Sequence, residues 1–87
     1  MAVTAGMVVR SKAGRDTGGW FVVISTEGEY AYLVNGEQRK LDRPKKKKLK
    51  HLQVTTYVSE FIANKVNSGT KVTNQEVRKA LADYLDM

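Results

Sequence analysis

The chain has 87 residues, which is the length of one small domain and leaves little room for a deep catalytic pocket. It contains no cysteine, which excludes disulfides and thiolate metal sites, and no apolar run approaches the roughly 20 residues that a membrane-spanning helix needs. The net charge is +6, and the N-terminal stretch lacks the basic-then-apolar order of a signal peptide, so we expect a cytoplasmic protein.

The positive charge is confined to the first part of the chain. Residues 1–53 carry 11 of the 15 lysines and arginines and 5 of the 9 acidic residues, whereas residues 54–87 carry 4 of each sign. This division predicts a polyanion-binding unit over residues 1–53, with its basic segment over residues 39–50, followed by a neutral extension over residues 54–87.

Two short apolar runs flank a charged loop near the N-terminus. Residues 7–10 and 20–24 are rich in β-branched and aromatic side chains, which favours strands. The loop between them carries Lys12, Gly14 and Arg15, and a glycine there allows a positive φ or a close approach of the backbone to a ligand. An equally simple interpretation is that the glycines only turn the chain.

A hairpin is expected at Asn35-Gly36, because this dipeptide fits a type I′ turn. It would join a strand over residues 29–34 to a returning strand over residues 37–41. A two-residue turn would place Tyr32 opposite Arg39 as a stacked pair on one face. A bulge would shift this register by one residue and reverse the faces.

The basic segment follows this hairpin. Between positions 39 and 50, one aspartate stands against eight basic residues, namely Arg39, Lys40, Arg43, Lys45, Lys46, Lys47, Lys48 and Lys50. Four consecutive lysines repel one another, so we expect them on a solvated surface until an anion neutralises them. Leu49 and Leu52 are expected to return the chain to the core. About five strands in all suit a small SH3-like barrel.

The pattern changes to helical spacing after residue 54. A first helix is predicted with Thr56 as its cap, residues 67–69 as its end, and an apolar stripe of Val58, Phe61, Ile62 and Val66. A second helix is predicted by the capping box of Thr73 and Glu76, by the staple positions of Val72 and Val77, and by the stripe Val77, Ala80, Leu81, Tyr84 and Leu85. We therefore predict an α+β, mainly β fold, in which the barrel is followed by a two-helix hairpin. Whether this hairpin packs on the barrel, dimerises or docks a partner stays open.

Enzyme chemistry finds no support in the sequence. The single histidine, His51, lies among lysines, with no cysteine and no obvious carboxylate neighbour to complete a metal site or a triad. No P-loop, GxSxG or HExxH motif is present. We expect neither an enzyme nor a metal site or cofactor, and His51 is better explained as a surface residue that touches phosphate.

Nucleic-acid binding is favoured by the lysine cluster, the glycine loop and aromatic residues near arginine. Lysines neutralise phosphates, and Tyr32 or Trp20 could stack on an unpaired base, although Trp20 is better explained as a core residue. RNA is favoured over duplex DNA because no basic helix suits the major groove. The candidate RNA-binding residues are Lys12, Gly14, Arg15, Tyr32, Arg39, Lys40, Arg43, Lys45, Lys46, Lys47, Lys48, Lys50 and His51.

Several short motifs over residues 5–53 carry a family resemblance. They are Gly6-Met7-Val8-Val9, Ser11-Lys12-Ala13-Gly14-Arg15-Asp16, Gly18, Phe21-Val22-Val23, Tyr32-Leu33-Val34-Asn35-Gly36, Arg39-Lys40-Leu41 and the stretch PKKKKLKHL. In this order they resemble the small KOW-domain RNA-binding proteins of bacteria, which are in turn similar to the L-fourteen-e group of large-subunit ribosomal proteins.

The resemblance implies an SH3-like barrel that binds ribosomal or ribosome-associated RNA, with ribosomal proteins as further partners. It also implies that Lys12, Gly14 and Arg15 lie at the RNA-facing loop. The helices after Thr55 have no counterpart in the minimal motif, which leaves open whether the protein is a ribosomal component or an accessory factor of translation.

Two alternatives remain. SH3-like barrels also bind proteins, so the chain could be a protein-interaction module that docks through the barrel or the helical hairpin. Neutralising residues 45–48 should then leave its function intact, whereas changes at Leu81 or Tyr84 should abolish it. The stretch PKKKKLK also matches a nuclear localisation signal, but this would need a eukaryotic source, and the resemblance is to bacterial proteins.

Overall fold

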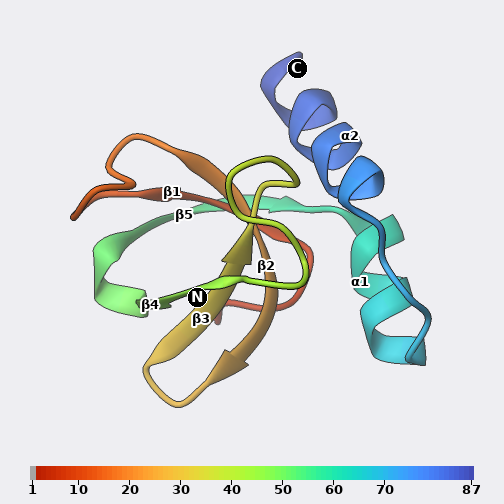
Figure 1. Cartoon of the computed structure of the whole chain (residues 1–87), viewed down its shortest axis with the longest axis horizontal. Coiled ribbons are helices and arrows are strands. Elements are labelled where there is room, and N and C mark those ends of the chain that lie inside the picture. Colours follow the sequence, from red (N-terminus) through yellow and green to blue (C-terminus); the bar gives the residue numbers. More distant parts are fainter. Residues whose placement is uncertain (1) are drawn as a thin grey trace.

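The computed structural model describes residues 2–87 as a five-stranded antiparallel sheet followed by two helices (Figure 1). The elements are β1 (Met7–Ser11), β2 (Trp20–Glu27), β3 (Tyr30–Val34), β4 (Lys45–Lys48), the 3-10 turn η1 (Leu49–His51), β5 (Leu52–Val58), α1 (Glu60–Ser68) and α2 (Asn74–Leu85). The strand order is β4-β3-β2-β1-β5, so β4 and β5 form the edges of an open sheet. The fold is therefore α+β and mainly β, as the sequence predicts.

Strand β2 is longer than predicted. Val23 pairs with Leu33 and Ser25 pairs with Tyr32, so Ile24 is the extra residue of a β-bulge, which bends the strand. The predicted range of 20–24 is too short, because β2 continues to Glu27 and turns into β3 at Gly28-Glu29. Gly28 has a φ of 58° and Glu29 has no positive φ, as a type II′ turn requires.

The hairpin predicted at Asn35-Gly36 is wrong, and so is the strand predicted over residues 37–41. Residues 35–44 form a loop instead. The Oδ1 atom of Asn35 accepts hydrogen bonds from the backbone N–H groups of Glu37 at 3.0 Å and Arg39 at 2.9 Å. These local bonds occupy donors that a returning strand would need for its ladder.

The strand that returns along β3 is β4, the four-lysine run itself. Tyr32 lies opposite Lys46 and Tyr30 opposite Lys48, so the predicted Tyr32–Arg39 pair is wrong. Lys47 is buried, which contradicts the expectation that the whole run stays solvated. Lysines on an edge strand also oppose pairing with a strand of another chain, because the approach of a second edge would bury their charge.

Strand β5 ends later, and the first helix begins later, than the sequence suggests. β5 runs to Val58, so the expected division between residues 53 and 54 falls inside a strand. The cap of α1 is Ser59 and not Thr56, and the Ser59 Oγ accepts a hydrogen bond from the Ile62 N–H at 3.3 Å. The helix ends at Gly69 in the left-handed conformation, as predicted.

The start of α2 is as the sequence predicts. Thr73 Oγ1 accepts from the Glu76 N–H at 3.2 Å, and Glu76 Oε1 accepts from the Thr73 N–H at 2.9 Å, which completes the capping box. Val72 and Val77, at the two staple positions, lie in the same apolar cluster. Neither helix in residues 2–87 is long and apolar enough to cross a membrane.

Each face of the sheet carries an apolar cluster. One cluster joins three strands to both helices through Val8, Val22, Val34, Ile62, Val72, Val77, Ala80 and Leu81. The other lies on the opposite face and contains Met7, Val9, Phe21, Val23, Ala31, Leu33 and Leu52. The helical hairpin therefore packs on the sheet of its own chain, which answers a question that the sequence leaves open (Figure 1).

Glu76 also joins α2 to α1, and this contact predicts a pH effect. Its Oε2 lies 2.7 Å from the Lys65 Nζ. This hydrogen bond is the largest cause of the lowered pKa of Glu76, and the hydrogen bond from the Thr73 backbone is the second. A carboxyl group whose pKa is lowered by folding stabilises the fold above its unfolded-state pKa, and this contribution is lost as pH falls through the folded-state pKa. The substitution Glu76→Gln removes the charge and keeps an oxygen for the capping box.

We therefore expect urea denaturation to give a larger free energy of unfolding for the wild type than for Glu76→Gln at neutral pH. The difference between the two proteins should shrink as the pH is lowered. The matched control is Glu37→Gln, because Glu37 is exposed and forms no ion pair with any residue in the range 2–87. A gap that stays constant from neutral to acid pH would contradict the contribution of the Glu76 charge.

Candidate nucleic-acid interface

The charged loop between β1 and β2 is held in one conformation by hydrogen bonds at its base and at its tip. At its base, the Ser11 N–H donates to the Gly19 carbonyl at 2.9 Å, and the Gly18 N–H donates to the Ser11 carbonyl at 2.8 Å. At its tip, the Gly14 carbonyl accepts from both the N–H and the hydroxyl of Thr17. Gly14 has a φ of 79°, so the turn needs a residue that tolerates this conformation.

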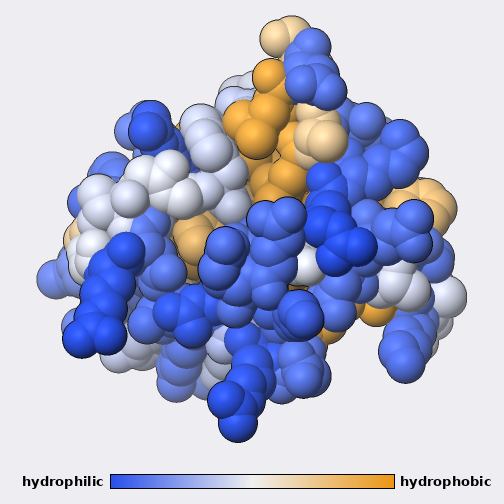
Figure 2. Space-filling view, turned by 45° about the horizontal axis from the view of Figure 1, so that its top comes forward, coloured by the Kyte–Doolittle hydropathy of each residue, from blue (hydrophilic) through white to orange (hydrophobic). Residues whose placement is uncertain are grey.

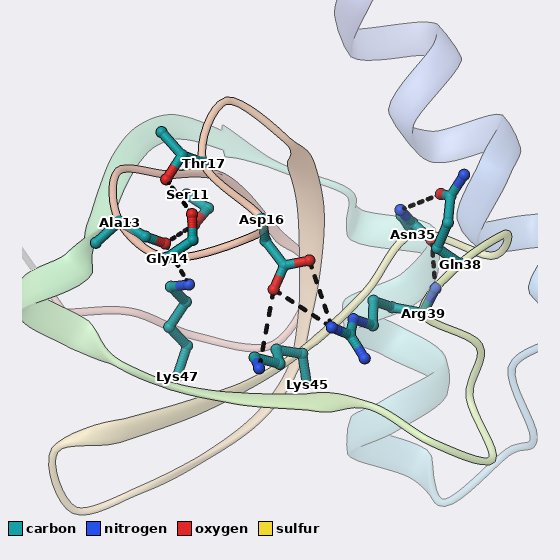
Figure 3. A network of polar contacts seen from close by, with 10 residues as sticks. All are labelled: Ser11, Ala13, Gly14, Asp16, Thr17, Asn35, Gln38, Arg39, Lys45 and Lys47. Carbon is teal, nitrogen blue, oxygen red and sulfur yellow. Dashed lines mark hydrogen bonds and ion pairs between the residues drawn. The ribbon is translucent and has the colours of Figure 1, made fainter.

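Three side chains from the basic segment hold this loop against the sheet (Figure 3). The Asp16 carboxylate lies 3.5 Å from the Arg39 Nη2 and 3.9 Å from the Lys45 Nζ. The Lys47 Nζ donates to the Ala13 carbonyl at 2.6 Å. The charges of Arg39 and Lys45 are therefore partly neutralised within the protein, by Asp16. Lys47 is buried and has a structural role.

The backbone brings η1 to the same place. The Lys12 N–H donates to the His51 carbonyl at 2.8 Å, and the Leu49 N–H donates to the Glu29 carbonyl at 2.8 Å. Loop 12–19, Arg39, β4 and η1 thus adjoin one another, and we call them, together with the residues 40–43 that follow Arg39, the basic surface. Apart from the buried Lys47, its cations that form no ion pair within residues 2–87 are Lys12, Arg15, Lys40, Arg43, Lys48 and Lys50.

Strands β3 and β4 present a second feature, which we call the tyrosine–lysine face: Tyr30, Tyr32, Lys46 and Lys48. The period of two in a strand places these four side chains on one side of the sheet. The Lys46 Nζ lies 4.6 Å from the ring centroid of Tyr30 and 6.0 Å from that of Tyr32, and the Lys48 Nζ lies 6.0 Å from that of Tyr30.

Sequence reasoning selected Tyr32 for this face and missed Tyr30. The signal that could have found Tyr30 is the alternation of Tyr30, Ala31 and Tyr32, which places both rings on one side whatever strand lies beside them. The Tyr32 hydroxyl donates to the Glu27 Oε1 at 3.2 Å, and the same oxygen lies 3.7 Å from the Lys46 Nζ.

Trp20 is half-buried and packs against the helix-facing cluster, in line with the structural role expected for it. Its ring centroid is 5.4 Å from that of Tyr84, which is in turn 5.3 Å from that of Tyr57. The Arg10 guanidinium lies 5.4 Å from the Trp20 ring. Arg10 is exposed and was missed among the candidate cations because it precedes the glycine loop.

Most of the surface seen in Figure 2 is hydrophilic, and hydrophobic side chains gather near the C-terminal end of α2. Leu85 and Met87 are exposed there. His51, which belongs to the basic surface, is half-buried. Residues 2–87 contain no group of three or more histidine, cysteine, aspartate or glutamate side chains that could hold a metal ion.

The geometry thus distinguishes the cations that hold the loop from those that form no ion pair, and it adds Tyr30 to the predicted Tyr32 beside the lysines of β4. A scan against protein-family models finds no match, and a search of curated proteins finds no similar sequence.

Proposed function

We propose that this chain is a non-enzymatic RNA-binding protein of the KOW type that binds ribosomal RNA and acts at the ribosome. The observation that carries the proposal is the gathering of cations from segments that are distant in the sequence. Segments from residue 12 to residue 51 meet on the basic surface, and six of its exposed or half-buried cations have no ion pair in the part of the chain that the structure describes. The KOW resemblance supplies the ribosomal part of the proposal.

The sheet topology supports an SH3-like barrel as the finer description of the fold. Strand β1 pairs with both β2 and β5, so the first and last strands of the sheet-forming region are neighbours. Strand β2 is long and bulged at Ile24, and a bulged strand of this kind can bend from one half of a small barrel to the other.

Phosphate neutralisation should supply most of the affinity. Exposed lysines and arginines bind phosphates and release the counterions condensed on the RNA, so the logarithm of the binding constant falls linearly with the logarithm of the salt concentration. With about six phosphate contacts we expect a slope of about −4 to −5. A flat salt response would contradict the proposal.

The experiment that tests this is a salt titration of RNA binding by fluorescence anisotropy. The double variant Lys46→Gln/Lys48→Gln removes two exposed or half-buried cations of the basic surface and should make the slope shallower by about 1.4, or about 0.7 per lost phosphate contact. The control Lys71→Gln/Lys79→Gln removes the same charge from exposed positions of the helical region. Equal effects of the two double variants would overturn the assignment of the binding surface.

The ribosomal assignment needs a second measurement, because the salt slope carries no sequence information. Ultraviolet crosslinking of the tagged protein in cells, followed by sequencing of the attached RNA, should give reads concentrated at one or two places in ribosomal RNA. Reads scattered over messenger RNA would retain RNA binding and discard the ribosomal assignment.

The alternative, a protein-docking module, loses one of its expected docking faces. Val77, Ala80 and Leu81 lie against the sheet and are buried, so most of the apolar stripe of α2 is already covered by the protein itself, and only its last residue, Leu85, is exposed. A change at Leu81 would act through folding and would not identify a partner. The exposed charge of the basic surface therefore favours RNA binding over docking through the hairpin.

A further inference from the structure

The tyrosine–lysine face contains two aromatic rings for which the proposed phosphate contacts give no role. Two aromatic rings and two ammonium groups alternate across neighbouring strands, with Tyr30 opposite Lys48 and Tyr32 opposite Lys46. Phosphate binding needs the lysines but has no use for the rings. Aromatic rings interleaved with cations on a sheet are suited to nucleic acid whose bases are accessible.

We propose that Tyr30 and Tyr32 each stack on an unpaired base, so that the RNA segment bound at this face is single-stranded and extended. This inference deepens the proposed function and rests on it. Side chains two residues apart on one strand are separated by about 6.6 Å, whereas bases in a continuous stack advance by about 3.4 Å. The two rings therefore match neighbouring bases only where the strand is splayed out of a helical stack.

Lys46 is placed to exchange one partner for another when RNA binds. Its ammonium lies between the two rings, 4.6 Å from one centroid and 6.0 Å from the other, and its pair with Glu27 spans 3.7 Å with the Glu27 side chain 70% exposed. An exposed cation–π contact is weaker than the stacking of a base on an aromatic ring. A base can thus displace the flexible ammonium, which then reaches the adjoining phosphate.

Duplex RNA cannot make these contacts, because both faces of its bases are already stacked. Its deep, narrow major groove also excludes side chains. The face should therefore discriminate between unpaired and paired RNA, and this discrimination should depend on the rings, whereas the salt dependence should depend on the lysines.

The test compares an unstructured RNA of about ten nucleotides with the same RNA annealed to its complement, each measured by fluorescence anisotropy across a range of salt. We expect the wild type to bind the single strand more tightly. The variant Tyr30→Leu/Tyr32→Leu should lose about tenfold or more in affinity for the single strand, since each stacked base contributes about five- to 150-fold. Its salt slope should stay at the wild-type value, because no phosphate contact is removed.

The matched control is Tyr30→Phe/Tyr32→Phe, which keeps both rings and should bind within about threefold of the wild type. Circular dichroism checks that each variant is folded, and if the leucine pair is unfolded, Tyr32→Leu alone provides the test.

Wild-type binding that is unchanged in the leucine variant, or equal for single strand and duplex, would overturn the stacking inference and leave the proposed function standing. A wild type that binds neither RNA at low salt would overturn both.

Discussion

Replacing Ile62 with alanine should cost about 2–5 kcal/mol of unfolding free energy, the usual range for truncating a large buried aliphatic side chain. Ile62 is the one buried residue of α1, with 0% of its surface exposed, and it joins the cluster between the helices and the sheet. A domain of this length is stable by about 4–13 kcal/mol, so this single change should remove a large fraction of the total. Urea denaturation followed by circular dichroism measures the loss.

The neighbouring residue Phe61 is the control. Its side chain is larger than that of Ile62, yet it is 56% exposed, and it meets the Lys65 Nζ 5.0 Å from its ring centroid. Phe61→Ala should therefore cost clearly less than Ile62→Ala, because more than half of the Phe61 surface is already in contact with water. If both variants lost the same amount, the orientation of α1 on the sheet would be wrong.

Local signals in the sequence predicted the parts of the fold that depend on neighbouring residues. The capping box of Thr73 and Glu76 fixes the start of α2 through hydrogen bonds within four residues, so no distant contact can alter it at low cost. The strands on either side of the glycine loop were also predicted, since β-branched residues over positions 7–10 and 20–24 favour extended backbone.

Two errors arose where residues distant in sequence decide the structure. Thr55 and Thr56 were interpreted as the approach to a helix, but β1 offers a strand partner, and the Thr55 hydroxyl donates to the Val8 carbonyl at 2.6 Å. The lysine run was expected to avoid packing, yet Lys47 buries its aliphatic stem while its ammonium bonds to the Ala13 carbonyl. Neither partner can be identified from the local pattern.

The candidate site shows the same limit. The sequence identifies which residues are basic, but it cannot separate the cations that hold the loop from those that are free. That separation depends on Asp16, which lies 23 residues from Arg39 along the chain and 3.5 Å from it in space. The sequence shows that Tyr30 shares a face with Tyr32, but it does not show that lysines of β4 are the cross-strand neighbours of both rings.

The failed Asn35-Gly36 hairpin has a specific physical explanation, which is that α2 occupies the space beside Gly36. The Gly36 carbonyl accepts from the Arg78 Nη1 at 2.7 Å, and the Leu41 N–H donates to the Asn74 Oδ1 at 2.9 Å. A strand over residues 37–41 would have to give up both bonds. The turn propensity of the dipeptide is thus outweighed by contacts with a helix about 40 residues later in the chain.

Gly36→Ala should therefore cost more than about 2 kcal/mol of unfolding free energy. A β-carbon there would lie 2.5 Å from the Asn74 carbonyl oxygen and 2.7 Å from the Arg78 Cγ, and the φ of 80° adds about 1–2 kcal/mol for any L side chain. Gly69→Ala is the matched control, because Gly69 has a φ of 74° and no atom within 4 Å of the added carbon.

The difference between the two variants isolates the close approach of the loop to α2, since the conformational strain is common to both. Urea denaturation at one pH gives both values. If Gly36→Ala cost no more than Gly69→Ala, loop 35–44 would not be packed on α2, and the Asn35-Gly36 turn would again be free to form a hairpin. A clearly larger loss at Gly36 would establish that this helix, acting through the backbone of one glycine, sets the path of the chain into the lysine strand.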